Sequence, residues 1–99
     1  MKAALIHFAK GVARQNAPNK VRCNVVSPGT VFFEDGVWGN VKRGMPDFFD
    51  QMIKRNPTGR MATPEEIAAA TVFLASPRSA FTTGANMIVD GAITQRVNY

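Results

Sequence analysis

Residues 21–31 of this 99-residue chain read Val21-Arg22-Cys23-Asn24-Val25-Val26-Ser27-Pro28-Gly29-Thr30-Val31. The residues before the serine are rich in β-branched side chains, and the Ser-Pro-Gly sequence that follows them is typical of a turn. We therefore predict a buried strand over residues 21–26 that ends in a turn. A second apolar segment, residues 85–91, follows Gly84 and is the second predicted strand.

Three other segments have the patterns of helices. In residues 2–16 the apolar side chains recur at the spacing of one helix face, and these are Leu5, Phe8, Ala9 and Val12. Residues 46–55 are predicted as a shorter helix, and residues 30–44 before it as a loop. In the third helix Thr63 is the N-cap, and Glu66 stands where a capping box requires an acid. This helix should end near Ser76-Pro77.

The order of these segments is helix, strand, loop with a short helix, helix, strand. Two strands connected through a helix predict a parallel pair with a right-handed crossover, which is an α/β arrangement. Parallel strands are normally flanked by further strands, so at least one sheet edge is expected to be open. The pattern therefore indicates a piece of a larger α/β fold, or a protomer that borrows strands from a partner.

Charge and composition exclude several classes of protein. Lys and Arg total 12 and Asp and Glu total 7, giving a formal net charge of +5. The basic residues are scattered, so nucleic-acid binding is a distant third hypothesis, whereas phosphorylated cofactors are compatible with the charge. The single cysteine and the absence of a metal-ligand spacing argue against a disulfide framework and a metal site. No membrane span or targeting signal is found, which predicts a cytoplasmic protein.

Several motifs coincide with one family. Residues 24–31 resemble the N-x-V-x-P-G-x-[IV] turn of the short-chain dehydrogenases/reductases, and residues 59–76 resemble that family's late helix and its lead-in. Thr83-Gly84 and residues 89–92 resemble its last strand. The resemblance implies the C-terminal part of a Rossmann-like, doubly wound parallel sheet. We expect one truncated domain over residues 1–99, with a substrate-loop region at residues 30–56.

The resemblance also implies an activity. The complete enzyme would be an NAD(P)-dependent oxidoreductase that transfers a hydride between nicotinamide and a carbonyl or alcohol substrate. Lys2 stands at the catalytic Lys of the family's Tyr-x-x-x-Lys motif, and the family's Ser and Tyr would precede residue 1. A glycine-rich dinucleotide loop is absent from this sequence. We therefore expect NAD or NADP in the complete enzyme and not on this chain alone.

Two groups of residues are implied as binding sites. Pro28, Gly29, Thr30 and Val31 would form the floor beneath the nicotinamide, with the Val31 backbone contacting its carboxamide. The aromatic residues of the variable loop would line the substrate pocket, although they are also suited to covering the core. They are Phe32, Phe33, Trp38, Phe48 and Phe49.

A second hypothesis belongs to another class of function. The chain would be a catalytically silent module that acts only by self-association or partner binding. This module would associate through its open sheet edge and apolar faces. For the oxidoreductase the resemblance implies a homo-oligomer, formed through residues 64–76 and 85–91, which match the family's subunit contacts. No nucleic-acid or membrane partner is expected.

Overall fold

The computed structural model describes residues 2–97. The chain forms two compact units. The first unit comprises Met1–Ser27 and Ala68–Ile88, and the second comprises Pro28–Ile67 and Val89–Tyr99. Each unit therefore contains two segments that are distant in sequence. The expectation of one domain over residues 1–99 stays a prediction.

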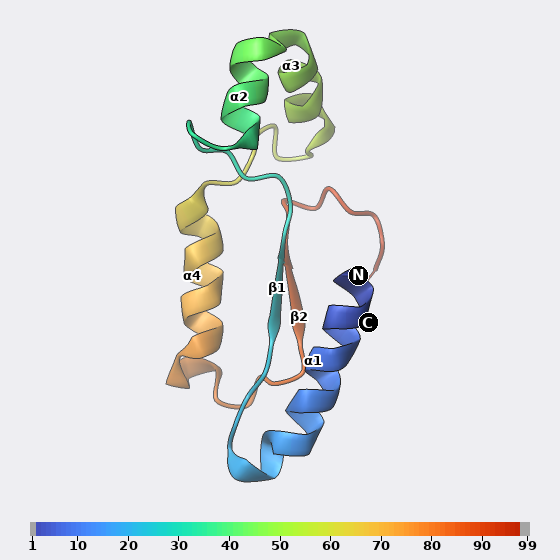
Figure 1. The fold of residues 1–99 in the computed structure, drawn as a ribbon, viewed down its shortest axis with the longest axis vertical. Helices are drawn as coiled ribbons and strands as arrows, with labels where there is room; N and C mark the ends of the chain where they lie inside the picture. The colour runs from blue at the N-terminus through green and yellow to red at the C-terminus, as the bar shows by residue number, and fades with distance from the viewer. Residues whose placement is uncertain (1, 98–99) are drawn as a thin grey trace. The chain divides into compact units, whose positions relative to one another are not determined.

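The two predicted strands pair side by side. They are β1 (Val25–Pro28) and β2 (Asn86–Val89), and they form a two-stranded sheet (Figure 1). The Val25 N–H donates to the Ala85 carbonyl and the Gly29 N–H donates to the Val89 carbonyl, both at 2.9 Å. Pairing therefore advances by the same interval on both strands, which makes them parallel. The α/β prediction is confirmed.

The first strand begins later than the sequence predicted. Residues 21–24 lie outside β1, because hydrogen bonds to side chains interrupt the regular ladder there, although the Gly84 N–H still donates to the Cys23 carbonyl at 2.8 Å. The Cys23 N–H donates to Thr83 Oγ1 at 3.1 Å, and the Asn24 amide both donates to the Thr82 carbonyl and accepts from the Ala85 N–H. Ser27 and Pro28, predicted as turn residues, belong to the strand instead.

In the first unit, α1 (Lys2–Asn16) confirms the predicted helix and is followed by a short 3-10 turn, Ala17–Asn19. Its buried residues are the small Ala9 and Ala13, whereas Leu5 and Phe8 are 62% and 70% exposed. Alanine allows a close approach: a Cβ on Gly84 would lie 3.4 Å from that of Ala13. The apolar pattern thus identified the helix, but Leu5 and Phe8 do not face the core, whereas Val12 is half-buried.

The helix α4 (Pro64–Ala75) ends within the first unit, before the 3-10 turn Pro77–Ser79. The Arg22 guanidinium donates to the carbonyls of Leu74, Ser76 and Thr82 and to Ser79 Oγ, at 2.7–3.2 Å. These carbonyls lie where a helix leaves acceptors unpaired and carries partial negative charge. A single cation therefore caps the helix and ties it to the segment before β1.

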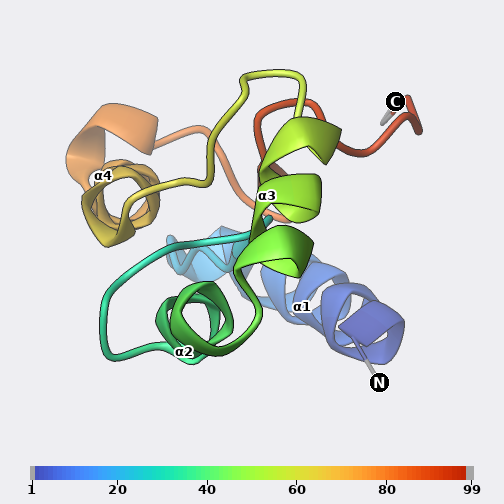
Figure 2. The same cartoon turned by 90° about the horizontal axis from the view of Figure 1, so that it is seen from above.

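The second unit holds the loop that follows β1. Its helices α2 (Val37–Gly44) and α3 (Pro46–Arg55) lie side by side (Figures 1 and 2). The prediction of α3 is confirmed, but residues 37–44 were predicted as loop and form a helix. Glycines disfavour helices, which misled the prediction. Here Gly39 packs so closely on the Glu34 carbonyl that any Cβ would clash with it.

Within residues 2–97, no helix is long and apolar enough to cross a membrane.

Candidate cofactor and substrate site

The predicted cofactor turn, residues 28–31, begins with the last residue of β1 and lies in the second unit. Gly29 lies against Asp90 at the end of β2, and a Cβ on Gly29 would approach Asp90 Cβ to 2.7 Å. Only glycine therefore permits this approach of the two strand ends. This close approach lies at the carboxyl end of the parallel pair, where open α/β sheets bind their ligands.

The backbone of Val31 has free hydrogen-bonding groups. A parallel bridge joins Val31 to Ala62, in which the Phe32 N–H donates to the Ala62 carbonyl and the Ala62 N–H donates to the Thr30 carbonyl. In extended backbone, alternate residues direct their N–H and C=O to opposite sides. The Val31 N–H and C=O therefore point away from Ala62, and they have no partner among residues 2–97. A primary amide, which has one acceptor and two donors, fits this pair.

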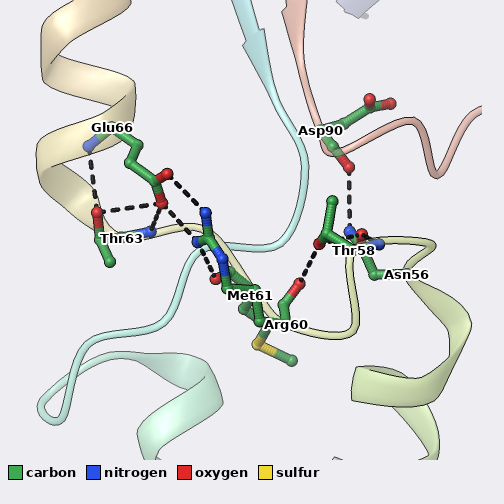
Figure 3. A network of polar contacts seen from close by, with 7 residues as sticks. All are labelled: Asn56, Thr58, Arg60, Met61, Thr63, Glu66 and Asp90. Atoms are coloured by element: carbon green, nitrogen blue, oxygen red, sulfur yellow. Dashed lines mark hydrogen bonds and ion pairs between the residues drawn. The ribbon is translucent and has the colours of Figure 1, made fainter.

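A buried amide connects the end of the loop to the end of β2. Asn56 is 6% exposed; its Nδ2 donates to the Asp90 carbonyl at 3.1 Å, and its Oδ1 accepts from the Thr58 N–H and hydroxyl (Figure 3). Gly91 has a φ of +65°, and a Cβ there would lie 2.8 Å from Asn56 Oδ1. Asn56 therefore holds the backbone of Asp90 and Gly91 in place, and Asp90 is the residue that packs against Gly29 of the cofactor turn.

The Asp90 carboxylate is used within its own turn. It accepts from the Thr94 hydroxyl at 2.7 Å, from the Thr94 N–H and from the Ala92 N–H. The Thr94 hydroxyl makes the largest contribution to lowering the pKa of Asp90. A carboxylate held ionised by these donors is a turn-forming group and is poorly suited to act as a general acid.

The start of α4 carries the predicted capping box. The Thr63 hydroxyl accepts from the Glu66 N–H, and Glu66 Oε1 accepts from the Thr63 N–H (Figure 3). Arg60 forms a bidentate ion pair with Glu66 at 2.7 and 2.8 Å. Its guanidinium is the main reason that the pKa of Glu66 falls to about 2. Both charges are thereby balanced at the edge of the site.

A cavity of about 100 Å³ lies beside this network, with polar side chains and strand-end backbone in its wall. Ligand pockets for drug-sized molecules are several times larger. The cavity is therefore too small for a nicotinamide nucleotide. Its lining includes Thr30, Asn56, Arg60 and Asp90.

The aromatic residues of the loop form two pairs. The Phe32 and Phe49 rings meet edge to face with centroids 5.7 Å apart, and the Trp38 and Phe48 rings stack at 6.3 Å. Phe49 is buried, so it belongs to the core of the second unit, whereas Phe33 and Phe48 are exposed. The loop therefore combines both interpretations: part of it is core and part is an accessible aromatic surface.

Lys2, the predicted catalytic lysine, begins α1 in the first unit and is exposed. The residues of the predicted cofactor turn and the aromatic residues of the loop both belong to the second unit. Sequence reasoning missed Asn56, whose signal is the turn sequence Asn56-Pro57-Thr58-Gly59. No group of His, Cys, Asp and Glu side chains within residues 2–97 is arranged to hold a metal ion.

Comparison with known proteins decides the family. A family model described as enoyl-(acyl carrier protein) reductase matches residues 1–94. A short-chain dehydrogenase of Aspergillus ruber, fogB, is 39% identical over 99 residues, which cover 94% of this chain and 33% of that protein. This chain belongs to the short-chain dehydrogenase/reductase family. The isoepoxydon dehydrogenase patN of Aspergillus clavatus is 35% identical over 93% of this chain and 36% of that protein.

Solved structures of the family share the fold of this short-chain dehydrogenase/reductase chain. YwfH, described as an NADPH-dependent reductase involved in bacilysin biosynthesis, superposes with a TM-score of 0.84 at 29% identity. The match covers 96% of this chain and 38% of YwfH. The chain thus spans roughly a third of the length of the curated relatives it matches.

Proposed function

We propose that this chain is the C-terminal segment of an NAD(P)-dependent oxidoreductase that transfers a hydride between nicotinamide and a carbonyl or alcohol substrate. The observation that carries this proposal is the free N–H and C=O of Val31, beside the glycine turn at the end of β1. The aromatic loop that follows this turn, residues 30–56, would cover the substrate. Family membership supports the oxidoreductase class.

The residues of the cofactor turn have distinct parts in this proposal. The Val31 N–H would donate to the nicotinamide carboxamide oxygen, and the Val31 carbonyl would accept from its amide group. Two bonds to one planar amide fix which face of the ring is presented to the substrate. Pro28, Gly29 and Thr30 would supply the flat backbone beneath the ring. When bound, the nicotinamide supplies or accepts the hydride.

Lys2 would act through the tyrosine of the family's Tyr-x-x-x-Lys motif. A nearby ammonium favours the phenolate and so lowers the pKa of a tyrosine. A tyrosine tuned in this way exchanges a proton with the substrate oxygen while the hydride moves. Residues 64–76 and 85–91 would form the contacts of a homo-oligomer.

The carrying observation is tested with Val31→Pro in the full natural protein that contains this chain. Proline removes the free N–H but keeps the extended backbone and both bonds to Ala62. We expect the Kd for NAD(P)H, measured by fluorescence titration, to rise about tenfold, because the loss of one hydrogen bond weakens binding by about that factor.

The matched control is Val31→Ala, which shortens the side chain and keeps the N–H. It should bind the cofactor like the unmodified protein. Equal affinities for the proline and alanine variants, with equal melting temperatures, would show that the Val31 N–H does not contact the cofactor.

A further inference from the structure

We propose that Lys42 binds an anionic group of the substrate, such as a carboxylate, beside the rings of Phe32 and Phe49. The inference rests on the proposed oxidoreductase function and narrows its substrate class to carbonyl or alcohol compounds that carry a negative charge. It concerns the second unit alone.

Lys42 lies on α2 and places its ammonium over two aromatic rings. The Nζ atom is 5.3 Å from the ring centroid of Phe32 and 5.8 Å from that of Phe49. These two rings meet edge to face, and the ammonium lies within cation–π distance of both. A lysine restrained in this way has less conformational freedom left to lose when it binds a ligand.

The rings attract the ammonium but do not neutralise it. Aromatic faces accept no strong hydrogen bond from an ammonium, and Lys42 has no ion pair or hydrogen bond with another side chain in the described part of the chain. The neighbouring cation differs: Arg43 pairs with Glu34, donating to its carbonyl and lying 3.6 Å from its carboxylate. Lys42 therefore offers a full charge and unused N–H donors.

The position of Lys42 relates it to the proposed chemistry. Phe32 directly follows Val31, the residue proposed to hold the carboxamide. An anion bound to Lys42 would thus lie against the same segment of chain that orients the nicotinamide. An apolar wall with one polar anchor is the usual composition of a small-molecule site. A cationic substrate is disfavoured, because it would meet a like charge already seated on the rings.

The test uses the full natural protein with a reduced nicotinamide cofactor and two matched pairs of substrates. They are para-carboxybenzaldehyde with its methyl ester, and pyruvate with methyl pyruvate. The unmodified protein should prefer the acid in at least one pair. Lys42→Gln should raise KM for that acid about tenfold and leave KM for the ester unchanged, because only the acid loses a charged partner.

Two further variants separate recognition from stability. Lys54→Gln removes the same charge from the same loop region, at the end of α3, where the lysine has no cation–π contact with a ring of residues 2–97. It should leave the preference for the acid intact. Lys42→Arg keeps both the charge and the ring contact, so it should retain most of the preference.

The KM values of the unmodified protein and of Lys42→Gln test the inference. The inference would be overturned if Lys42→Gln raised KM equally for acid and ester, or if the unmodified protein preferred neither acid over its ester. The oxidoreductase function would still stand in both cases. Turnover of no compound in either pair would also count against the inference, whereas failure of the unmodified protein to bind NAD(P)H in a fluorescence titration would contradict the proposed function itself.

Discussion

At the scale of single residues, Glu66 shows how one side chain serves two partners. Its carboxylate closes the capping box with Thr63 and pairs with Arg60, and its pKa falls from the usual 4.5 to about 2. Since the pKa is lower in the folded state, the stabilisation is fully present above pH 4.5 and is lost as the pH falls toward 2.

We expect Glu66→Gln to flatten this acid transition. Glutamine keeps an oxygen for the capping box but does not ionise. The melting temperature of the variant, followed by circular dichroism, should change less than that of the unmodified protein between pH 4.5 and 2. Glu65→Gln is the control, because it removes one charge from the same helical turn without touching Arg60. Parallel profiles for the Glu66 variant and the unmodified protein would contradict the prediction.

The capping box and the hydrogen-bond network around Asn56 differ in how well the sequence predicts them. Thr63 and Glu66 are three positions apart and interact within one helical turn, so local spacing is sufficient. Asn56 contacts Asp90, which is 34 positions away, and no local pattern indicates that contact. The same holds for the free backbone of Val31, which depends on a bridge to Ala62.

At the scale of elements, Asn56 joins the end of α3 to the end of β2. We expect Asn56→Ala to lower the free energy of unfolding by about 2 kcal/mol, because it leaves the Asp90 carbonyl and the Thr58 N–H without their hydrogen-bond partner. Asn56→Asp separates the two halves of the network, since it keeps the acceptor for Thr58 and replaces the donor to Asp90.

Chemical denaturation measures both variants. If the bond to Asp90 matters, the aspartate variant should be destabilised as well, although its side chain has almost the same shape. Thr58→Val serves as the control for the hydroxyl alone. An aspartate variant as stable as the unmodified protein would mean that the contact with Asp90 contributes little.

The elements also show where patterns fail. The prediction placed a strand at residues 21–26, but hydrogen bonds to the side chains of Asn24 and Thr83 interrupt the regular ladder at its start. It placed a loop at residues 37–44, where Gly36 and Gly39 in fact permit α2 to form by close packing. In both places tertiary contacts override local propensity. Helices with strong local signals, such as α1 and α3, were predicted with their observed bounds.

At the scale of the whole molecule, few apolar side chains are buried. The buried apolar residues among those described are Ala9, Ala13, Phe49, Met61 and Leu74. Meanwhile Val72 and Phe73 on α4, and Ile88 on β2, remain exposed. Large apolar side chains left exposed are the kind of surface that association buries. These three residues fall within the segments 64–76 and 85–91 proposed for self-association.

We expect Val72→Asp to weaken self-association of the full natural protein about thirtyfold or more, because an interface would bury the new carboxylate without a partner. Val72 is 66% exposed, so folding should be unaffected. The control is Val37→Asp, which places the same charge on α2 at a position that is 73% exposed and outside both segments. Sedimentation velocity at micromolar concentration should give an oligomer for the unmodified protein and the control, and a smaller species for Val72→Asp. A monomer in all three samples would refute the proposed oligomer, and an oligomer in all three would place its contacts elsewhere.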